Sequence, residues 1–189
     1  MAKVLKGPPT WIAQMPALLI GADVGEKPNF MAVAWAGMAN CEPPIVSAAI
    51  RPAQHTLTGI RAHGEFSVNV PSQSQYKKVD FCGLNFGASV NKAQVCGFSN
   101  YYGTLQHAPL IEERAVNPEC SAVQITELDS RCLVLGKVAD IHASEECVSA
   151  DGKIDFLRVN PPVFLDNPTR KYCTVGTAKA EAFRVGVEL

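Results

Sequence analysis

"NFMAVAWAGMANCEPPIVSAAIRPAQHT", residues 29–56, is the stretch that decides the fold class of this chain. It reads as two strands, over residues 30–37 and 44–51, which are bounded by turn residues and separated by a short segment that ends at Pro43. Two strands this close together in sequence predict that β-structure forms the framework of the molecule.

The two strands also carry small and polar residues that suit a ligand. Side chains alternate across a strand, so Asn29, Met31 and Trp35 are expected to share one face of the first strand. In the second strand the small run from Ser47 to Ala49 leaves room on both sides. Such room suits either a flat ligand or a closely packed neighbouring strand.

The second strand leads into a cluster of polar residues. Arg51, Gln54, His55 and Thr56 gather at the start of a short helix expected over residues 54–64, whose first backbone N–H groups are unpaired. This arrangement predicts a seat for a phosphate group. The alternative is ordinary barrel packing, with Arg51 at a solvated strand end and Thr56 as a helix cap.

Strand signals dominate the rest of the chain. A tight turn at Asp129-Ser130 joins two long strands, and residues 160–169 read as a proline-punctuated surface strand or loop. We therefore expect a mainly β fold with short accessory helices, in a single domain that spans residues 1–189. Further strands are expected at 16–24, 65–71, 120–129, 131–144 and 170–176, and further helices at 73–83 and 89–97, with Gly64, Gly83 and Gly97 as helix stops and Ser89 as a cap.

Composition argues against several partners. The chain of 189 residues has 17 Lys and Arg against 18 Asp and Glu, so no charge surplus attracts a nucleic acid or an acidic membrane surface. The longest apolar run, residues 31–39, is too short to cross a bilayer, and the amino-terminal residues lack the apolar core of a signal peptide. We expect a cytoplasmic protein with no membrane and no nucleic acid partner.

The seven cysteines do not predict a disulfide framework, because their number is odd and no signal peptide is evident. Most are expected to be buried thiols. Cys41, in a turn, is a candidate for thiol redox sensing, although Glu42 beside it disfavours the thiolate. No CxxC, HxxxH or HExxH spacing occurs, so no metal site is expected, and the usual nucleotide-binding loops and the GxSxG motif are also missing.

Several segments in order carry a resemblance to a known family. They are "NFMAVAWAG", "PPIVSAAIRPAQHT", "EFSVNVP", "FCGLNFGASVNKAQVCG", "APLIEE", "LVLGKV" and "KYCTVG". Together they resemble the flavin reductase-like family, in particular its flavoredoxin branch, over nearly the whole chain. The resemblance implies a split β-barrel that binds FMN, as a homodimer with FMN near the subunit interface.

The resemblance also implies roles for individual residues. Asn29, Met31 and Trp35 would lie beside the flavin, and Ser47 would offer it a hydroxyl group. Thr56, with Arg51 and His55, would meet the phosphate, where charge-assisted hydrogen bonds are strongest. The remaining implied contacts are a second positive charge from Lys92 and an aromatic ring from Phe164 packed over the flavin. Read without the resemblance, Lys92 is a solvated helix lysine and Phe164 a core aromatic on an edge strand.

The chain departs from the family pattern in places. In "CGLNFGASVNKA", Phe86, Asn91 and Ala93 stand where relatives commonly have Ser, Asp and Phe. Arg131 stands where the family often has His, so a permanent cation replaces a titratable one. If Arg131 approaches the flavin, it should favour the anionic reduced form and raise the midpoint potential.

The implied function is that of an FMN-dependent oxidoreductase of the flavin reductase type. The electrons would come from NAD(P)H or from a redox protein partner, and the sequence does not separate these two donors. No side chain is assigned as a general base, because the flavin carries the chemistry. The alternative function is a β-barrel binding module without flavin or redox activity.

Overall fold

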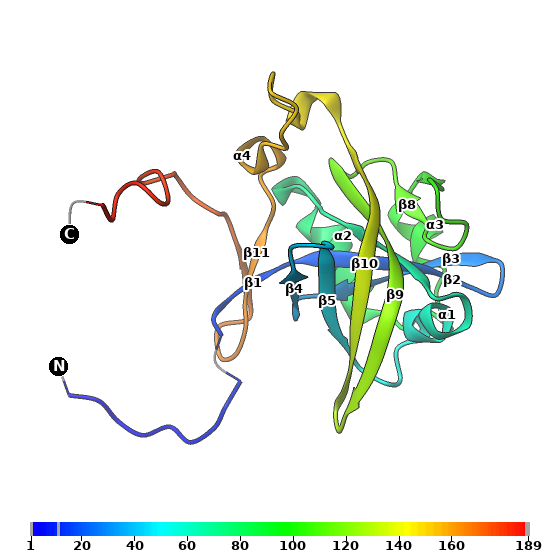
Figure 1. Ribbon diagram of the computed structural model, residues 1–189. Helices are drawn as coiled ribbons and strands as arrows, with labels where there is room; N and C mark the ends of the chain where they lie inside the picture. Colours follow the sequence, from blue (N-terminus) through cyan, green and yellow to red (C-terminus); the bar gives the residue numbers. More distant parts are fainter. Residues whose placement is uncertain (1, 11, 188–189) are drawn as a thin grey trace.

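A seven-stranded antiparallel sheet forms the body of the protein, which a computed structural model describes over residues 2–10 and 12–187. Its two ends curl toward each other, so that residues of β3 and β5 enter the same buried cluster (Figure 1). The sheet is therefore a mainly β barrel with short helices around it. In spatial order its strands are β3 (Lys27–Val33), β2 (Leu18–Val24), β6 (Glu65–Asn69), β9 (Val116–Leu128), β10 (Arg131–Ala143), β5 (Ile45–Ile50) and β4 (Ala36–Asn40).

Smaller elements surround the barrel. A three-stranded sheet joins the two end regions of the chain, and a two-stranded ribbon covers one side. The strands of these sheets are β1 (Gln14–Pro16), β11 (Val163–Leu165) and β12 (Lys171–Cys173), and β7 (Asn100–Tyr101) with β8 (Leu110–Ile111). The helices are α1 (His55–His63), α2 (Tyr76–Leu84), α3 (Lys92–Cys96) and α4 (Phe156–Val159), with short 3₁₀ turns η1 (Gln73–Gln75) and η2 (Glu145–Cys147). Among the described residues no helix is long and apolar enough to cross a membrane.

Local signals located several of these elements correctly. The hairpin of β9 and β10 turns at Asp129-Ser130, and α1 and α3 end at Gly64 and Gly97, both with positive φ. Two expected boundaries are wrong. Helix α2 continues through Gly83 to Leu84, and the cap of α3 is Asn91 rather than Ser89, because the Asn91 side chain accepts a hydrogen bond from the Gln94 N–H.

The strand expected over residues 30–37 is interrupted in the structure. β3 ends at Val33 and β4 begins at Ala36, so Trp35 lies in neither strand. The Trp35 carbonyl accepts a hydrogen bond from the Ala49 N–H at 2.8 Å, which starts the pairing with β5. The chain therefore leaves its partner β2 and crosses to β5 at this point, and Trp35 does not continue the face of Asn29 and Met31.

Two buried clusters hold the elements together. One fills the barrel, with Phe66 and Val134 among its members, and the other packs α2 and α3 against the outside of the sheet around Phe30. Five of the seven cysteines are buried, which confirms the expectation that most are core thiols. Of the other two cysteines, Cys41 is exposed and Cys173 is half-buried.

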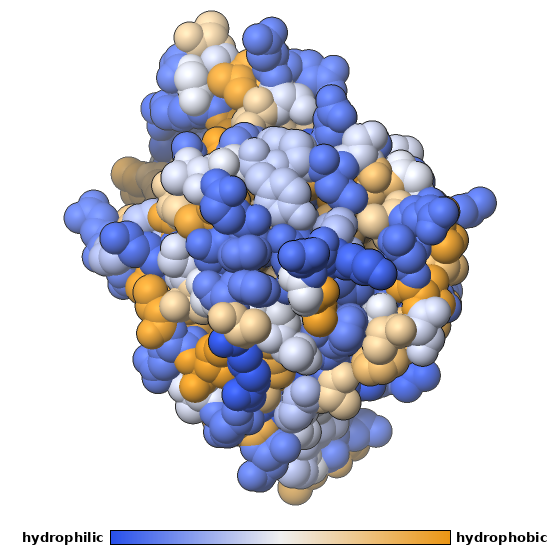
Figure 2. Space-filling view, turned by 90° about the vertical axis from the view of Figure 1, so that its right-hand side faces the viewer, coloured by the Kyte–Doolittle hydropathy of each residue, from blue (hydrophilic) through white to orange (hydrophobic). Residues whose placement is uncertain are grey.

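Both ends of the chain run away from the barrel as extended arms (Figure 1). The amino-terminal arm exposes Val4 and Leu5, and the carboxy-terminal arm exposes Phe183 and Val185. On the face that carries α1, α3 and the β2–β3 hairpin, by contrast, apolar residues form small patches among polar ones (Figure 2). The apolar side chains of the arms are left uncovered by the rest of the described chain.

A buried carboxylate anchors the loop that follows β7. Glu119 on β9 is fully buried and accepts hydrogen bonds from the N–H groups of Thr104 and Leu105, at 2.9 and 2.7 Å. It also lies 2.9 Å from Nε2 of His142 on β10. Burial alone would raise the pKa of Glu119, but the bonds from Leu105, His142 and Thr104 together hold this pKa below its usual value. The ionised carboxylate therefore stabilises the folded state.

Candidate functional site

A cavity of about 210 Å³ opens where β3 and β5 end and α1 is about to begin. We call it the cationic cavity because two arginines, Arg51 and Arg131, lie in its wall. Arg51 directly follows β5 and Arg131 is the first residue of the adjacent β10, so the pairing of these two strands brings both residues to one end of the barrel. The full lining is residues 31–35, Ala49, Arg51, Gln54, Gly83 and Arg131.

The charges of this cavity have no acidic partner among the described residues. Arg131 lies over the ring of Trp35, 4.8 Å from its centre, and donates a hydrogen bond to the Ser130 carbonyl at 2.8 Å. Neither Arg131 nor Arg51 has a carboxylate within ion-pair distance. Burial lowers the pKa of Arg131, and the charge of Arg51 lowers it further. An anion in the cavity would relieve this repulsion.

A second cavity, of about 340 Å³, continues along β3. We call it the loop cavity because residues 87–91, between α2 and α3, form much of its wall opposite Asn29 and His55. The two cavities are neighbours, since Asn29 and Met31 are alternate residues of β3 and Gln54 directly precedes His55. A Cβ atom at Gly87 would clash with the Asn29 side chain, so a glycine is needed for the loop to approach the strand this closely.

Thr56 supports this site from behind. Its hydroxyl is buried and accepts a hydrogen bond of 2.7 Å from Nδ2 of Asn29. It does not cap α1, because the capping position is occupied by Gln54, which makes no side-chain capping bond. Thr56 therefore lines neither cavity, and it fixes the amide of Asn29 in the wall of the loop cavity.

Among the predicted site residues, six line the two cavities. Met31, Trp35, Arg51 and Arg131 belong to the cationic cavity, and Asn29 and His55 to the loop cavity. Ser47 lies apart from both, because its hydroxyl donates a hydrogen bond to the Gly37 carbonyl across the β4–β5 pair at 3.1 Å.

Lys92 and Phe164 are placed differently from the roles expected for them. Lys92 is 2% exposed and donates a hydrogen bond to the Cys82 carbonyl at 2.8 Å, and its burial lowers its pKa. It is therefore neither a solvated helix lysine nor a residue of either cavity wall. Phe164 packs on Tyr172, with ring centres 5.6 Å apart, and against the outer core cluster, as the alternative of a core aromatic predicted.

Sequence reasoning missed several residues of the cavity walls. Gly83 lines the cationic cavity and residues 87–91 line the loop cavity, whereas Gln54 and Ala49 of the cationic cavity belong to the predicted polar cluster and the predicted small run. The sequence signals for the loop were Gly87, between two segments with helical periodicity, and the family-like segment "CGLNFGASVNKA" that contains it. Their position depends on the packing of α2 and α3 on the sheet, which local patterns do not specify.

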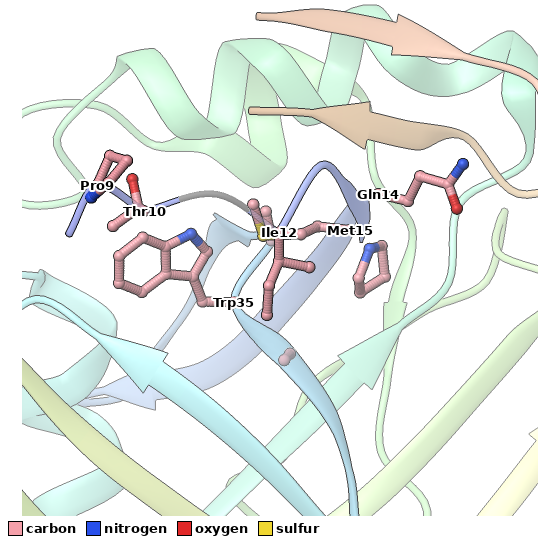
Figure 3. A pocket seen from close by; sticks show the side chains of 9 residues that line it. Pro9, Thr10, Ile12, Gln14, Met15 and Trp35 are labelled. Carbon is pink, nitrogen blue, oxygen red and sulfur yellow. The ribbon is translucent and has the colours of Figure 1, made fainter. Parts of the chain in front are cut away.

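A third, mainly apolar cavity of about 570 Å³ lies on the other side of Trp35, beneath the amino-terminal arm (Figure 3). Figure 3 shows the Trp35 ring below Pro9 and Thr10 of this arm, with Ile12 beside it. The same side chain lines the cationic cavity, so Trp35 is a wall shared by a charged and an apolar space.

Known proteins with the same architecture were found by sequence and by structure. A family model described as a flavin reductase like domain matches residues 13–175. An uncharacterised protein of Archaeoglobus fulgidus is 30% identical over 130 residues, which are 69% of this chain and 72% of that protein.

Two solved structures match over nearly the full length. Flavoredoxin from Methanosarcina acetivorans is 32% identical with a TM-score of 0.93, and the match covers 99% of each chain. Flavoredoxin of Desulfovibrio vulgaris (Miyazaki F) is 30% identical with a TM-score of 0.90, covering 98% of this chain and all of that one. A more distant FMN-binding protein from Thermus thermophilus, 17% identical with a TM-score of 0.77, shares the fold. The chain therefore belongs to the flavin reductase-like family and has its split-barrel fold.

Proposed function

We propose that this protein is a flavin-dependent oxidoreductase that binds FMN across the cationic and loop cavities. The observation that carries the proposal is the pair Arg51 and Arg131, two cations that have no acidic partner within the described part of the chain and lie in one cavity beside the first turn of α1. FMN is an anion with a long planar ring, and the two neighbouring cavities offer a charged space and an extended wall along β3. Likeness to two flavoredoxins supports the same ligand class.

The residues present fit this cofactor. Arg51 and the free N–H groups at the start of α1 would hold the phosphate, because charge-assisted hydrogen bonds are about twice as strong as neutral ones. His55 and Asn29, in the loop cavity, would hold the polar chain that links the phosphate to the ring. The ring would lie against Met31 and the Trp35–Arg131 pair.

When bound, FMN supplies the electron or hydride transfer, and the protein supplies position and electrostatics. The positive charge of Arg131 would favour the more negative reduced state and so raise the midpoint potential. Trp35 would exclude water from one edge of the site, since it separates the cationic cavity from the apolar one. No side chain needs to act as a general base.

The electron donor is either NAD(P)H or a redox protein partner, and the proposed function is compatible with each of these two donors. The protein has almost equal numbers of acidic and basic residues, which gives little support to docking with a strongly charged protein. We also propose that the protein is a homodimer. The support is the pair of extended arms, whose exposed apolar residues would be covered by a second copy.

An absorbance spectrum of the purified protein, supplemented with FMN, tests the proposal. Flavin bands that remain after gel filtration are expected, and anaerobic addition of NADH or NADPH, followed by dithionite, then identifies the donor. Bleaching by the nucleotide indicates a reductase, and bleaching only by dithionite indicates reduction by a protein partner. Arg51→Ala should retain much less FMN, whereas Arg158→Ala, at an exposed arginine outside the cavities, should behave as wild type. A wild-type protein without flavin bands would refute the proposal and favour a binding module without flavin.

A further inference from the structure

Two cysteine thiols meet behind the wall of the two cavities. Cys82 lies in the last turn of α2 and Cys96 is the last residue of α3, and their sulfur atoms are 4.0 Å apart. Cys82 is 1% exposed and Cys96 is 8% exposed. This separation is about twice the length of a disulfide bond, roughly 2.05 Å, so a small movement of the two helices would join the sulfurs.

Two buried cations accompany these thiols. Lys92 precedes Cys96 by four residues, which places both on the same face of α3, and its ammonium group donates to the Cys82 carbonyl at 2.8 Å. Arg114 is 2% exposed and stacks over Phe98, 5.0 Å from the ring centre. None of its three guanidinium nitrogens has a hydrogen-bond partner among the described residues.

Both cysteines lie close enough to act electrostatically on both cations, and Glu113 also acts on Arg114. Neither Lys92 nor Arg114 has a carboxylate within ion-pair distance in the described part of the chain, and a buried cation without a counter-charge is unfavourable. Burial raises the pKa of Cys82 to about 12, and the charges of Lys92 and Arg114 act against this rise. The two cations therefore make the Cys82 thiolate less unfavourable than burial and the neighbouring Cys96 alone would leave it.

We propose that Cys82 and Cys96 form a reversible dithiol–disulfide couple that a hydroperoxide oxidises. Cys96, the more exposed, attacks one peroxide oxygen; the O–O bond breaks, and the products are a sulfenic acid on Cys96 and water or an alcohol. The Cys82 sulfur then displaces the hydroxyl group from this sulfenic acid, which forms the S–S bond and releases water. The two thiol protons leave in the two released molecules, and a small thiol reverses the oxidation by exchange.

Formation of the Cys82–Cys96 disulfide would affect the two cavities because of where the two cysteines lie. Residues 83–95 lie between the two cysteines and include Gly83, in the wall of the cationic cavity, and residues 87–91 of the loop cavity. Drawing α2 and α3 together would reshape this wall. On the basis of the proposed function, the disulfide should weaken FMN binding by about tenfold, which is a change that a titration resolves easily.

Peptide mapping after oxidation tests the couple without any flavin. The folded protein is treated with hydrogen peroxide, denatured in acid, and alkylated, with and without prior reduction by dithiothreitol. We expect one cross-linked peptide pair that contains Cys82 and Cys96, lighter by two hydrogen atoms, which dithiothreitol separates. Cys96→Ala should abolish this product, and Cys147→Ala, at a buried thiol in a different cluster, should leave it unchanged.

The outcomes decide the proposal in either direction. Two outcomes would overturn the couple, provided that circular dichroism shows a folded protein. One is full alkylation of both cysteines after peroxide treatment, and the other is oxidation of Cys96 to a sulfinic acid without any bond to Cys82. FMN titration of the reduced and oxidised forms is a separate measurement. If neither form binds FMN, the proposed function fails while the dithiol couple stands; if both bind FMN equally, the effect on the site is refuted.

Discussion

Replacing Thr56 by Val tests the hydrogen bond that fixes Asn29 in the wall of the loop cavity. The Thr56 hydroxyl accepts this bond, 2.7 Å long, from Nδ2 of Asn29, and both side chains are buried. Valine has nearly the same shape as threonine, so no cavity forms, but the buried amide loses its partner. An unsatisfied buried donor costs about 1–3 kcal/mol, and we expect the free energy of unfolding to fall by this amount.

Urea unfolding, followed by circular dichroism, measures this change as a lower midpoint with an unchanged slope. Thr56→Ser is the matched control, because it keeps the hydroxyl and loses only a methyl group, at a cost of about 0.8 kcal/mol. A double-mutant cycle with Asn29→Ala isolates the bond, and we expect a coupling energy of about 1 kcal/mol or more. A Thr56→Val variant within about 0.5 kcal/mol of wild type, or a cycle without coupling, would refute the reasoning.

Three further predictions concern the two cavities and the buried Glu119. Arg131→Ala should weaken FMN binding about tenfold and lower the midpoint potential, as measured by fluorescence and redox titrations; an unchanged potential would contradict the role of this cation. Gly87→Ala should lower the free energy of unfolding by about 1–3 kcal/mol, because its Cβ would clash with Asn29. Gly37→Ala, where a Cβ meets open space, should stay within about 0.5 kcal/mol in the same urea experiment. The pKa of Glu119 is held below its usual value, so its stabilisation is complete above the unfolded value of about 4.3 and is lost as the pH falls through the lower folded value. Thermal unfolding from about pH 5 to 3 should therefore show a steeper loss of stability in wild type than in Glu119→Gln, and parallel curves would argue against this account.

The fold was largely predictable because two kinds of sequence signal specify it. Turn and helix-stop residues act locally, and the order of the family-like segments extends over nearly the whole chain. The turn at Asp129-Ser130 and the glycines that end α1 and α3 act within a few residues of themselves. The order of family-like segments then specified the split barrel, which the family match and the two flavoredoxin structures confirm. The break at Trp35 was not predictable in the same way. It depends on the pairing of β4 with β5, and the apolar run "FMAVAW", residues 30–35, contains no glycine, proline or other turn residue that would stop a strand at Val33.

The site was predictable where a strand end alone determines the position of a side chain. Arg51 and Arg131 lie at the paired ends of β5 and β10, so correct strand assignments already bring them together. The position of Ser47 outside both cavities could not be predicted, because its hydroxyl bonds to the neighbouring strand and that contact depends on which strand pairs with β5. The alternative role of Thr56 as a helix cap is wrong, and its burial behind Asn29 was not predictable because it follows from the packing of α1 on the barrel.

The position of Lys92 determines which other groups are available to bind the phosphate of FMN. Its ammonium group bonds to the Cys82 carbonyl, near the carboxy-terminal end of α2, where unpaired carbonyls and the helix dipole favour a positive charge. A lysine held there is 2% exposed and cannot reach a ligand in the loop cavity without giving up that bond. The phosphate of FMN, bound as proposed, would then depend on Arg51 and on the N–H groups of α1 for its counter-charge. The same buried position puts the Lys92 charge close to Cys82 and Cys96. In the dithiol couple proposed above, Lys92 would therefore act on the thiols rather than on the phosphate of the cofactor.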